Sequence, residues 1–303
     1  MKLKEKIASD WRLMCKSWVS YLFIAPFMII FFTFTVAPVL MSIGLSFTHF
    51  NVFEAPRFIG WQNYINLLFW DDVFLRAVQN TFVLALITGP VGYMLSLLFA
   101  WLINEFPRWL KTTLVVVFYA PTLSGQMFVI WRVVFSGDMY GYANSILLRF
   151  GFITEPIRWL TEEAYIMPIT IVVILWMSMG VGFLAFVAGV TNVDKNLYEA
   201  GYVDGIRNRW QELWFITLPY MKPQLLFGAI IAITGAFAVF DTAVALAGMP
   251  STNYANHTVV AHLVDVGTIR FEMGYASAIA VILFGTMILA NKGVQRLLRK
   301  VGT

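Results

Sequence analysis

The chain has 303 residues, of which 59% are hydrophobic and 13% are charged, and its formal net charge is +4. Its single cysteine, Cys15, excludes a disulfide and a cysteine-based metal site within the chain. The small positive charge does not require a nucleic-acid partner, because basic tails that lie against anionic lipid account for it.

Six long runs without Asp, Glu, Lys or Arg divide the sequence. Each has at least 18 residues, which is about the length that a helix needs to cross a ~30 Å hydrocarbon core. In lipid the backbone must satisfy its own hydrogen bonds, so helices are the expected form. We therefore predict an all-α, polytopic membrane protein. Its six transmembrane helices are expected near residues 20–47, 77–104, 112–136, 165–190, 223–247 and 274–292.

The N-terminal residues 1–19 form a basic tail before the first span. The apolar run that follows is too long for the apolar region of a secretory signal peptide and has no obvious cleavage site between small residues. We expect this run to be retained as the first span.

Lysine and arginine are distributed unevenly between the two sides of the predicted spans. Of the 21 basic residues, 15 lie in the N-terminal tail, in the loops 105–111 and 191–222, and in the C-terminal tail. The alternate loops 48–76, 137–164 and 248–273 together carry five, and Arg132 is the remaining one. The positive-inside rule therefore places both termini, including the tail 293–303, and the loop 191–222 in the cytoplasm.

The motifs that would indicate an enzyme are missing from the sequence. There is no G-x-x-x-x-G-K-[ST] phosphate loop, so we expect this chain not to hydrolyse ATP itself. The three histidines, His49, His257 and His262, all fall in predicted outer loops. The last two are poorly spaced for two ligands on one helical face, so we expect solvated histidines and no metal site.

A proton- or sodium-coupled carrier usually has ionisable groups at mid-membrane. Only Asp241 and Arg132 come close to this position, and the helical rise from the cytoplasmic ends of their spans places both near the outer surface. This position argues against secondary transport, and whether the two groups pair is left open.

The loop between the fourth and fifth predicted spans contains a charged, patterned segment, LYEAGYVDGIRNRWQELWFITLP (197–219). Asp194 can cap a first short helix before it. Asp204 and Gly205 form a turn pair, in which the glycine allows a positive φ or a close backbone approach.

After the turn, Ile206, Trp210, Leu213 and Trp214 have the spacing of one helical face. The pattern alone fits a surface helix that lies against lipid headgroups. It fits equally a helix that docks into a groove of a cytoplasmic partner, with the two tryptophans as anchors and Glu199 exposed.

The spacing E-A-G-x-x-D-G followed by I-T-L-P resembles the EAA loop of ABC-importer permeases. The matching residues are Glu199, Ala200, Asp204, Gly205, Ile216, Leu218 and Pro219. Two positions depart from the pattern, because Gly201 stands where alanine is usual and Ile206 where a small residue is common. Neither departure removes the acidic or glycine positions.

Other stretches resemble the carbohydrate-uptake branch of the same family. APFMIIFFTFTVAPVLMSIGLSFTHF (25–50) is similar to its first core span and FIGWQNYINLL (58–68) to its F-x-G-x-x-N-Y loop. A further motif is matched by Trp131, Phe135, Gly141, Asn144 and Leu147. AVFDTAVALAGMP (238–250) resembles the stretch that follows the fifth span, with a threonine and glycines partly lost.

The resemblance implies a type I ABC-importer permease fold, in which residues 20–292 form the permease domain of a bacterial or archaeal cytoplasmic membrane protein. It implies a second, non-identical permease subunit, two copies of a cytoplasmic ABC ATPase and an external solute-binding protein as partners. Mg-ATP is then bound by the ATPase, and this chain has no cofactor of its own. The residues implied to couple to the ATPase are Glu199, Ala200, Gly201, Asp204, Gly205, Trp210 and Trp214.

The same resemblance implies a sugar path at mid-depth of spans 3, 4 and 5. Its expected residues are Phe118, Thr122, Met177, Ser178 and Thr234. Aromatic and hydroxyl side chains suit a sugar, although serine and threonine also bridge helices. The function expected is carbohydrate import, with oligosaccharides as the expected substrates. A glycerophosphodiester or polyamine importer of the same architecture, or a secondary carrier, is the alternative.

Overall fold

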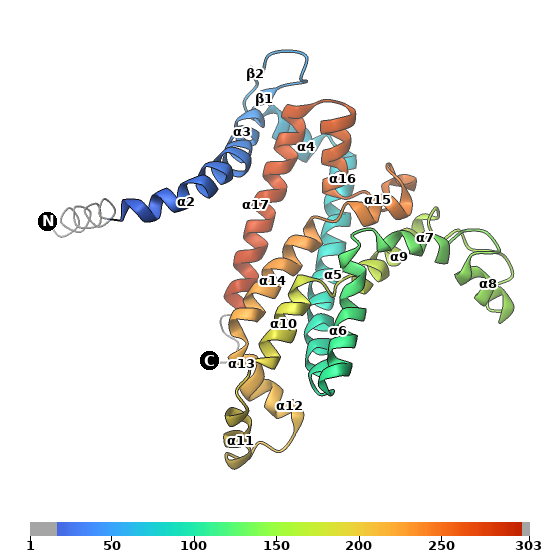
Figure 1. Cartoon of the computed structure of the whole chain (residues 1–303). Coiled ribbons are helices and arrows are strands. Elements are labelled where there is room, and N and C mark those ends of the chain that lie inside the picture. Colours follow the sequence, from blue (N-terminus) through green and yellow to red (C-terminus); the bar gives the residue numbers. More distant parts are fainter. Residues whose placement is uncertain (1–16, 299–303) are drawn as a thin grey trace.

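The computed structural model describes residues 17–298, which form a helical protein with one short β-hairpin (Figure 1). The first half contains α2 (Trp18–Phe31), η1 (Phe32–Val36), α3 (Ala37–Leu45), β1 (Thr48–His49), β2 (Arg57–Phe58), α4 (Gln62–Phe69), α5 (Asp72–Asn104), α6 (Arg108–Leu123), η2 (Met127–Val129), α7 (Ile130–Val134) and α8 (Tyr142–Arg149). The second half contains α9 (Glu163–Trp176), α10 (Val181–Thr191), α11 (Lys195–Val203), α12 (Arg209–Glu212), η3 (Leu213–Thr217), α13 (Leu218–Tyr220), α14 (Lys222–Phe237), α15 (Asp241–Ala247), η4 (Thr252–Tyr254), α16 (Val259–Val264), η5 (Asp265–Ile269) and α17 (Met273–Leu298). Most of the predicted N-terminal tail and the last five residues of the C-terminal tail lie outside the described residues.

Five helices are long and apolar enough to cross a membrane, which confirms the prediction of an all-α polytopic protein. They are Trp18–Leu45, Asp72–Asn104, Glu163–Thr191, Lys222–Ala247 and Met273–Leu298. Five of the six predicted spans therefore correspond to one apolar helix or to consecutive helical segments that together form one span.

The third predicted span, 112–136, differs from the prediction. The chain bends by 84° between α6 and the helices η2 and α7. Gly125 stands at the bend with φ +65°, a left-handed conformation that ends helices, and Pro121 already removes a donor in the last turn of α6. The apolar run is continuous in sequence, but its backbone is a bent pair.

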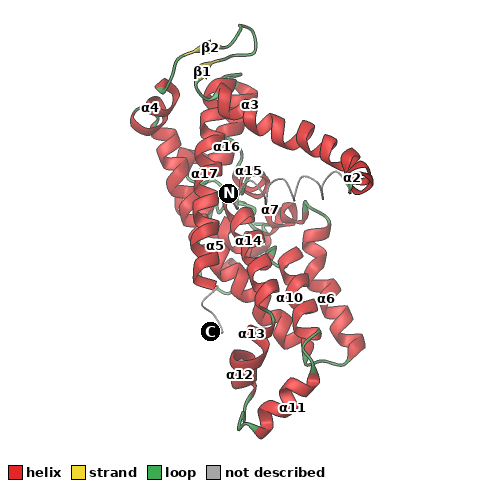
Figure 2. Cartoon of the chain, turned by 90° about the vertical axis from the view of Figure 1, so that its left-hand side faces the viewer, coloured by secondary structure: helices red, strands yellow, loops and turns green. Residues whose placement is uncertain are grey.

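The longest helix, α5, is the centre of the assembly. Its 33 residues correspond to about 50 Å at the helical rise. The helices α10 and α14 pack along it, and α9 and α16 also contact it. Figures 1 and 2 show that α5 runs from the end with α4 and the hairpin toward the end with α11 and α12.

The packing between these helices is close at mid-length. Phe186 of α10 is buried and its ring lies edge-on to Tyr93 of α5, with centroids 5.2 Å apart. On its other side, Gly228 of α14 lies so near that an added Cβ would overlap the Phe186 ring. A glycine is therefore required here for α10 and α14 to approach each other.

The first apolar helix, by contrast, makes few contacts within the chain. Its α2 part projects away from the other helices (Figure 1) and all its described side chains are exposed or half-exposed. Only the α3 part packs, against α17. This surface is covered by lipid or protein outside the chain, because it is apolar all round.

A buried polar cluster holds the Asp71 end of α5. Asp71 caps the helix by accepting a 2.8 Å hydrogen bond from the Phe74 amide. Its other carboxylate oxygen lies 3.1 Å from His262 Nε2 and accepts a 2.9 Å hydrogen bond from the Tyr275 hydroxyl. The cluster therefore joins α5 to α16 and α17.

Burial opposes the negative charge of Asp71, but hydrogen bonds from His262 and from the Phe74 amide outweigh it, and the pKa of Asp71 falls to about 2. His257 lies next to this cluster, with its ring 5.6 Å from that of His262. Burial, together with the neighbouring His262, lowers the pKa of His257 to about 4. Both predicted solvated loop histidines at this end are in fact buried.

Candidate functional site

Three apolar segments are interrupted at places that meet in space. The helix α6 ends before residues 124–126, α9 and α10 are separated by 177–180, and α14 and α15 are separated by 238–240. Broken helices are tolerated at membrane depth where the freed backbone groups line a cavity or are bonded by other side chains. Both conditions are met here.

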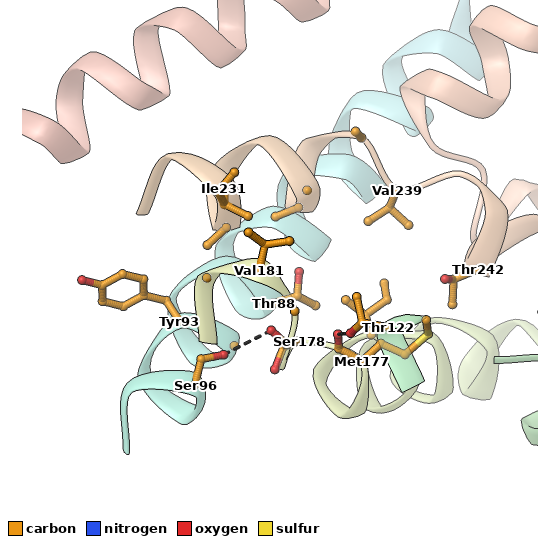
Figure 3. Close-up of a pocket in the computed structure, with 18 of the residues that line it drawn as sticks. Thr88, Tyr93, Ser96, Thr122, Met177, Ser178, Val181, Ile231, Val239 and Thr242 are labelled. Atoms are coloured by element: carbon orange, nitrogen blue, oxygen red, sulfur yellow. Dashed lines mark hydrogen bonds between the residues drawn. The ribbon is translucent and has the colours of Figure 1, made fainter. Parts of the chain in front are cut away.

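A cavity of about 440 Å³ lies where the three breaks meet. Its wall is formed by α5, by the end of α6, by both parts of the α9–α10 pair and by the α14–α15 pair (Figure 3). The lining side chains with hydroxyl or aromatic groups are Thr88, Tyr93, Ser96, Thr122, Phe128, Ser178, Phe240 and Thr242. Glycine and alanine make up much of the remaining lining.

Two hydroxyl groups brace the break between α9 and α10. Ser96 of α5 donates a 3.1 Å hydrogen bond to the Ser178 carbonyl. Thr122 of α6 lies 3.4 Å from the Met177 carbonyl and 3.3 Å from the Met179 carbonyl (Figure 3). The carbonyls that the break removes from the helix therefore bond to the two neighbouring helices.

Ser178 forms part of the cavity wall. Its oxygen is buried and has no hydrogen-bond partner within the described part of the chain. Most buried hydroxyl groups in proteins have a hydrogen-bond partner, so this one is an exception.

Three of the five residues expected on a sugar path line this cavity: Thr122, Met177 and Ser178. Phe118 lies elsewhere, because it packs against Phe99 of α5 with ring centroids 4.9 Å apart. Thr234 is exposed on α14 and is absent from the cavity lining, whereas its neighbour Gly235 is part of that lining. One residue rotates a helical side chain by about 100°, so a small alignment error moves it off the wall.

Sequence reasoning missed the contribution of α5. Thr88, Gly92 and Ser96 follow one another at intervals of four and all line the cavity. This stripe of small and hydroxyl residues on one helical face was a usable signal for a cavity wall or a close helix contact. Asp241 also lines the cavity, and the described ion pairs include none between it and Arg132.

At the opposite end of the structure from the hairpin, residues 195–212 form two short helices and a turn (Figure 2). Asp194 caps α11 by accepting a hydrogen bond from the Asn196 amide, as expected. Gly205 has φ +97°, so the turn requires its glycine. Asn208 then caps α12 by accepting from the Gln211 amide.

The predicted single helical face through Ile206, Trp210, Leu213 and Trp214 is wrong. Because Asn208 starts a new helix, Ile206 lies before α12 and outside its face. Leu213 packs against the buried cluster around α10. Trp210 and Trp214 are 65% and 64% exposed, so of these four residues the two tryptophans project from the protein.

The two residues that depart from the EAA pattern, Gly201 and Ile206, lie next to each other in the structure. Gly201 is buried, and a Cβ at this position would lie 2.7 Å from Ile216 Cδ1 and 3.1 Å from Ile206 Cδ1. Ile216 and the larger Ile206 therefore together fill the volume that an alanine side chain at position 201 would take. The departures compensate for each other in packing.

The other residues expected to couple to an ATPase are on the surface of this loop. Glu199, Ala200, Asp204 and Gly205 are exposed, as are the two tryptophans. Gly201 is buried beneath them, and the exposed residues lie on one loop that a partner can reach. Their roles stay predictions.

A buried carboxylate holds the loop together. Glu212 is 3% exposed, accepts a 2.6 Å hydrogen bond from the Tyr202 hydroxyl and pairs with Arg209 at 2.9 Å. The hydrogen bond to Glu212 raises the pKa of Tyr202. The loop is therefore a preformed surface, whose two helices are joined by the hydrogen bond from the Tyr202 hydroxyl to the Glu212 carboxylate.

Residues 89–301 match the family described as "Binding-protein-dependent transport system inner membrane component". The chain is 31% identical to the arabinooligosaccharides transport system permease protein AraP of Bacillus subtilis (strain 168), over 93% of this chain and 90% of that protein. It is 30% identical to the lactose transport system permease protein LacF of Rhizobium radiobacter, over 73% of each.

The fold is also similar to a solved structure. A chain of a bacterial ABC transporter involved in the import of the acidic polysaccharide alginate superposes with a TM-score of 0.79. The match covers 97% of this chain and 100% of that one, at 23% sequence identity. At this identity the likeness establishes the fold alone.

Proposed function

Because this chain belongs to the family of binding-protein-dependent transport system inner membrane components, we propose that it forms half of the path of an ATP-driven importer of uncharged oligosaccharides. As a member of this family it is a multi-pass protein of the cytoplasmic membrane and a transport subunit, not an enzyme. A secondary carrier, one of the alternatives considered from the sequence, is set aside by this membership.

The observation that carries the proposal is the cavity at the three helix breaks. Its hydroxyl groups, aromatic rings and small residues suit a flexible, hydroxyl-rich solute. Of the lining residues in the described part of the chain, Asp241 alone is charged, and it is negative. An anionic solute would gain nothing from this wall, so the lining favours a neutral sugar chain over an anionic one.

Two relatives carry sugars by name, one arabinooligosaccharides and the other lactose, which supports a carbohydrate substrate here. The proposed partners are a second permease subunit that supplies the other half of the path, an external solute-binding protein and two copies of a cytoplasmic ATPase that binds Mg-ATP. We assign the permease domain to residues 20–292 with both tails in the cytoplasm, following the distribution of lysine and arginine.

In this proposal the loop of α11 and α12 docks in the ATPase. Glu199 would form an ion pair with it, and the turn at Gly205 would allow close approach. Since α10 and α14 flank the loop in the chain, closure of the ATPase dimer would move both helices as rigid bodies and change the cavity between them.

The test is a reversal of charge at Glu199 in the co-expressed complex. Glu199 is exposed, so Glu199→Lys should fold and insert normally. We expect the variant to lose at least about tenfold in binding-protein-stimulated ATP hydrolysis, the scale of a disrupted charged contact at an interface. The matched control is Glu155→Lys, the same change at an exposed residue of the loop 137–164. Equal activity of the two variants would refute the docking role.

A further inference from the structure

The loop of α11 and α12 contacts α5, a helix that does not flank this loop in the sequence. Glu105 directly follows α5 and lies 2.7 Å from Arg209, the first residue of α12. The same guanidinium group pairs with Glu212 at 2.9 Å. We infer that Arg209 is a positioning residue that joins the docking loop to α5, so that movement of the loop reaches this helix directly. The inference rests on the proposed function.

The contact between Arg209 and Glu212 is held in place by the loop itself. Glu212 is buried and also accepts the Tyr202 hydroxyl, so its carboxylate cannot move without disturbing α11. Arg209 therefore has one nitrogen held by the loop and another free to pair with Glu105. A planar guanidinium with several fixed donors can bridge two carboxylates in this way, whereas the single ammonium of a lysine holds such a geometry poorly.

A second contact lies beside the ion pair. The rings of Trp101 on α5 and Trp210 on α12 are tilted to each other with centroids 5.1 Å apart. Within the same region, Lys111 donates hydrogen bonds of 2.6 Å to Asn104 and 2.5 Å to Thr191, the last residue of α10. The Asn104 end of α5 therefore contacts the docking loop and also the helix that leads into it.

The ion pair itself is exposed. Arg209 and Glu105 retain 59% and 38% of their side-chain surface, and pairs of this kind contribute little to stability. Its consequence is therefore geometric: together with the Trp101–Trp210 contact it orients α12 relative to α5. This matters for transport because α5 carries Thr88, Gly92 and Ser96 in the cavity wall.

The experiment measures nucleotide-driven movement in the full reconstituted complex, with spin labels in a Cys15→Ser background. One pair of labels, at Leu102→Cys and Leu297→Cys, reports on α5 against α17. A second pair, at Phe227→Cys and Leu297→Cys, reports on α14 against α17. All three positions are exposed in the structure. Distances are recorded before and after addition of a non-hydrolysable Mg-ATP analogue.

In the otherwise unchanged complex we expect both distances to shift. Glu105→Gln should remove most of the α5 shift, and Trp101→Leu with Glu105→Gln should remove more, while the α14 shift persists. Glu105→Asp should restore part of it, and Arg108→Gln, an exposed charge on the same turn, should change nothing.

A full α5 shift in the double variant would overturn the inference. Absence of any shift in either pair in the unchanged complex, with nucleotide bound, would refute the proposed function instead. The two failures are therefore distinguishable.

Discussion

The two ends of α5 are held by opposite kinds of contact. At Asp71 the helix is capped, and its carboxylate bonds to a histidine that is 2% exposed and to a tyrosine of α17. At Asn104 the helix is followed by Glu105, whose ion pair with Arg209 is open to solvent. One end is locked to neighbouring helices, and the other is joined to a loop by a contact that can exchange.

This difference indicates which end of the long helix α5 is free to move. Breaking a buried hydrogen-bonded cluster strands several polar groups at once, whereas an exposed pair is replaced by water at little cost. A helix that transmits movement as a lever is held at one end and is able to move at the other. In the proposed function, α5 would therefore be held at Asp71 and moved at Glu105.

The largest expected effect is at the fixed end. Asp71→Ala removes the cap and leaves His262 and Tyr275 without their acceptor, which should lower the free energy of unfolding by about 3 kcal/mol. SDS titration of the purified complex measures this loss. Asp72→Ala, an exposed neighbour, is the control, and an equal effect of both would contradict a locked end.

A smaller loss is expected in the middle of the bundle. Gly228→Ala places a methyl group against the buried Phe186 ring, and overpacking of this kind costs about 2 kcal/mol. Gly235→Ala, on the same helix with open space around it, should cost little. If Gly228→Ala were more damaging than Asp71→Ala in the same titration, the bundle interior and not the helix end would fix α5.

The fixed end should also respond to pH. The pKa of His257 is about 4 when folded and 6.5 in the reference state, so between these values the unfolded chain binds a proton that the folded chain does not. Acidification from pH 7 to pH 5 should therefore destabilise the protein, by about 1–2 kcal/mol from this group. His257→Gln should flatten the pH profile of thermal unfolding, and His49→Gln, at an exposed site, should leave it unchanged.

The smallest expected effect on stability is at the moving end. Glu105→Gln should change the free energy of unfolding by less than about 1 kcal/mol, because the pair is exposed. The same SDS titration checks this value. A loss as large as that of Asp71→Ala would remove the contrast between the two ends.

Much of the fold followed from the sequence because length and apolarity determine spans. Five spans appeared as predicted, but nothing in the composition of 112–136 distinguished a straight helix from the bend at Gly125. A glycine adopts either hand of backbone at similar cost, so its conformation depends on the packing around it.

The spacing of residues along the chain predicted the loop of α11 and α12 better than it predicted the wall of the cavity. The helix cap at Asp194 and the turn at Gly205 depend on residues close to them in the sequence, and both were predictable. Ile206 was misplaced because the cap at Asn208 restarts the helix. The cavity wall depends on the rotation of several helices about one another, which is why Phe118 and Thr234 fell outside it.

The three helix breaks have a consequence for the evolution of this protein. Residues at 124–126, 177–180 and 238–240 stand outside the regular helical ladder, so apart from Ser178 and the buried Met179, which pack against neighbouring helices, their side chains can be exchanged with little change to the packing of α5, α10 and α14. Selection can therefore act on the breaks without first repairing a damaged bundle. We expect homologues that transport different sugars to have diverged mainly at these positions, and the glycine at 228 to have been inherited with little change.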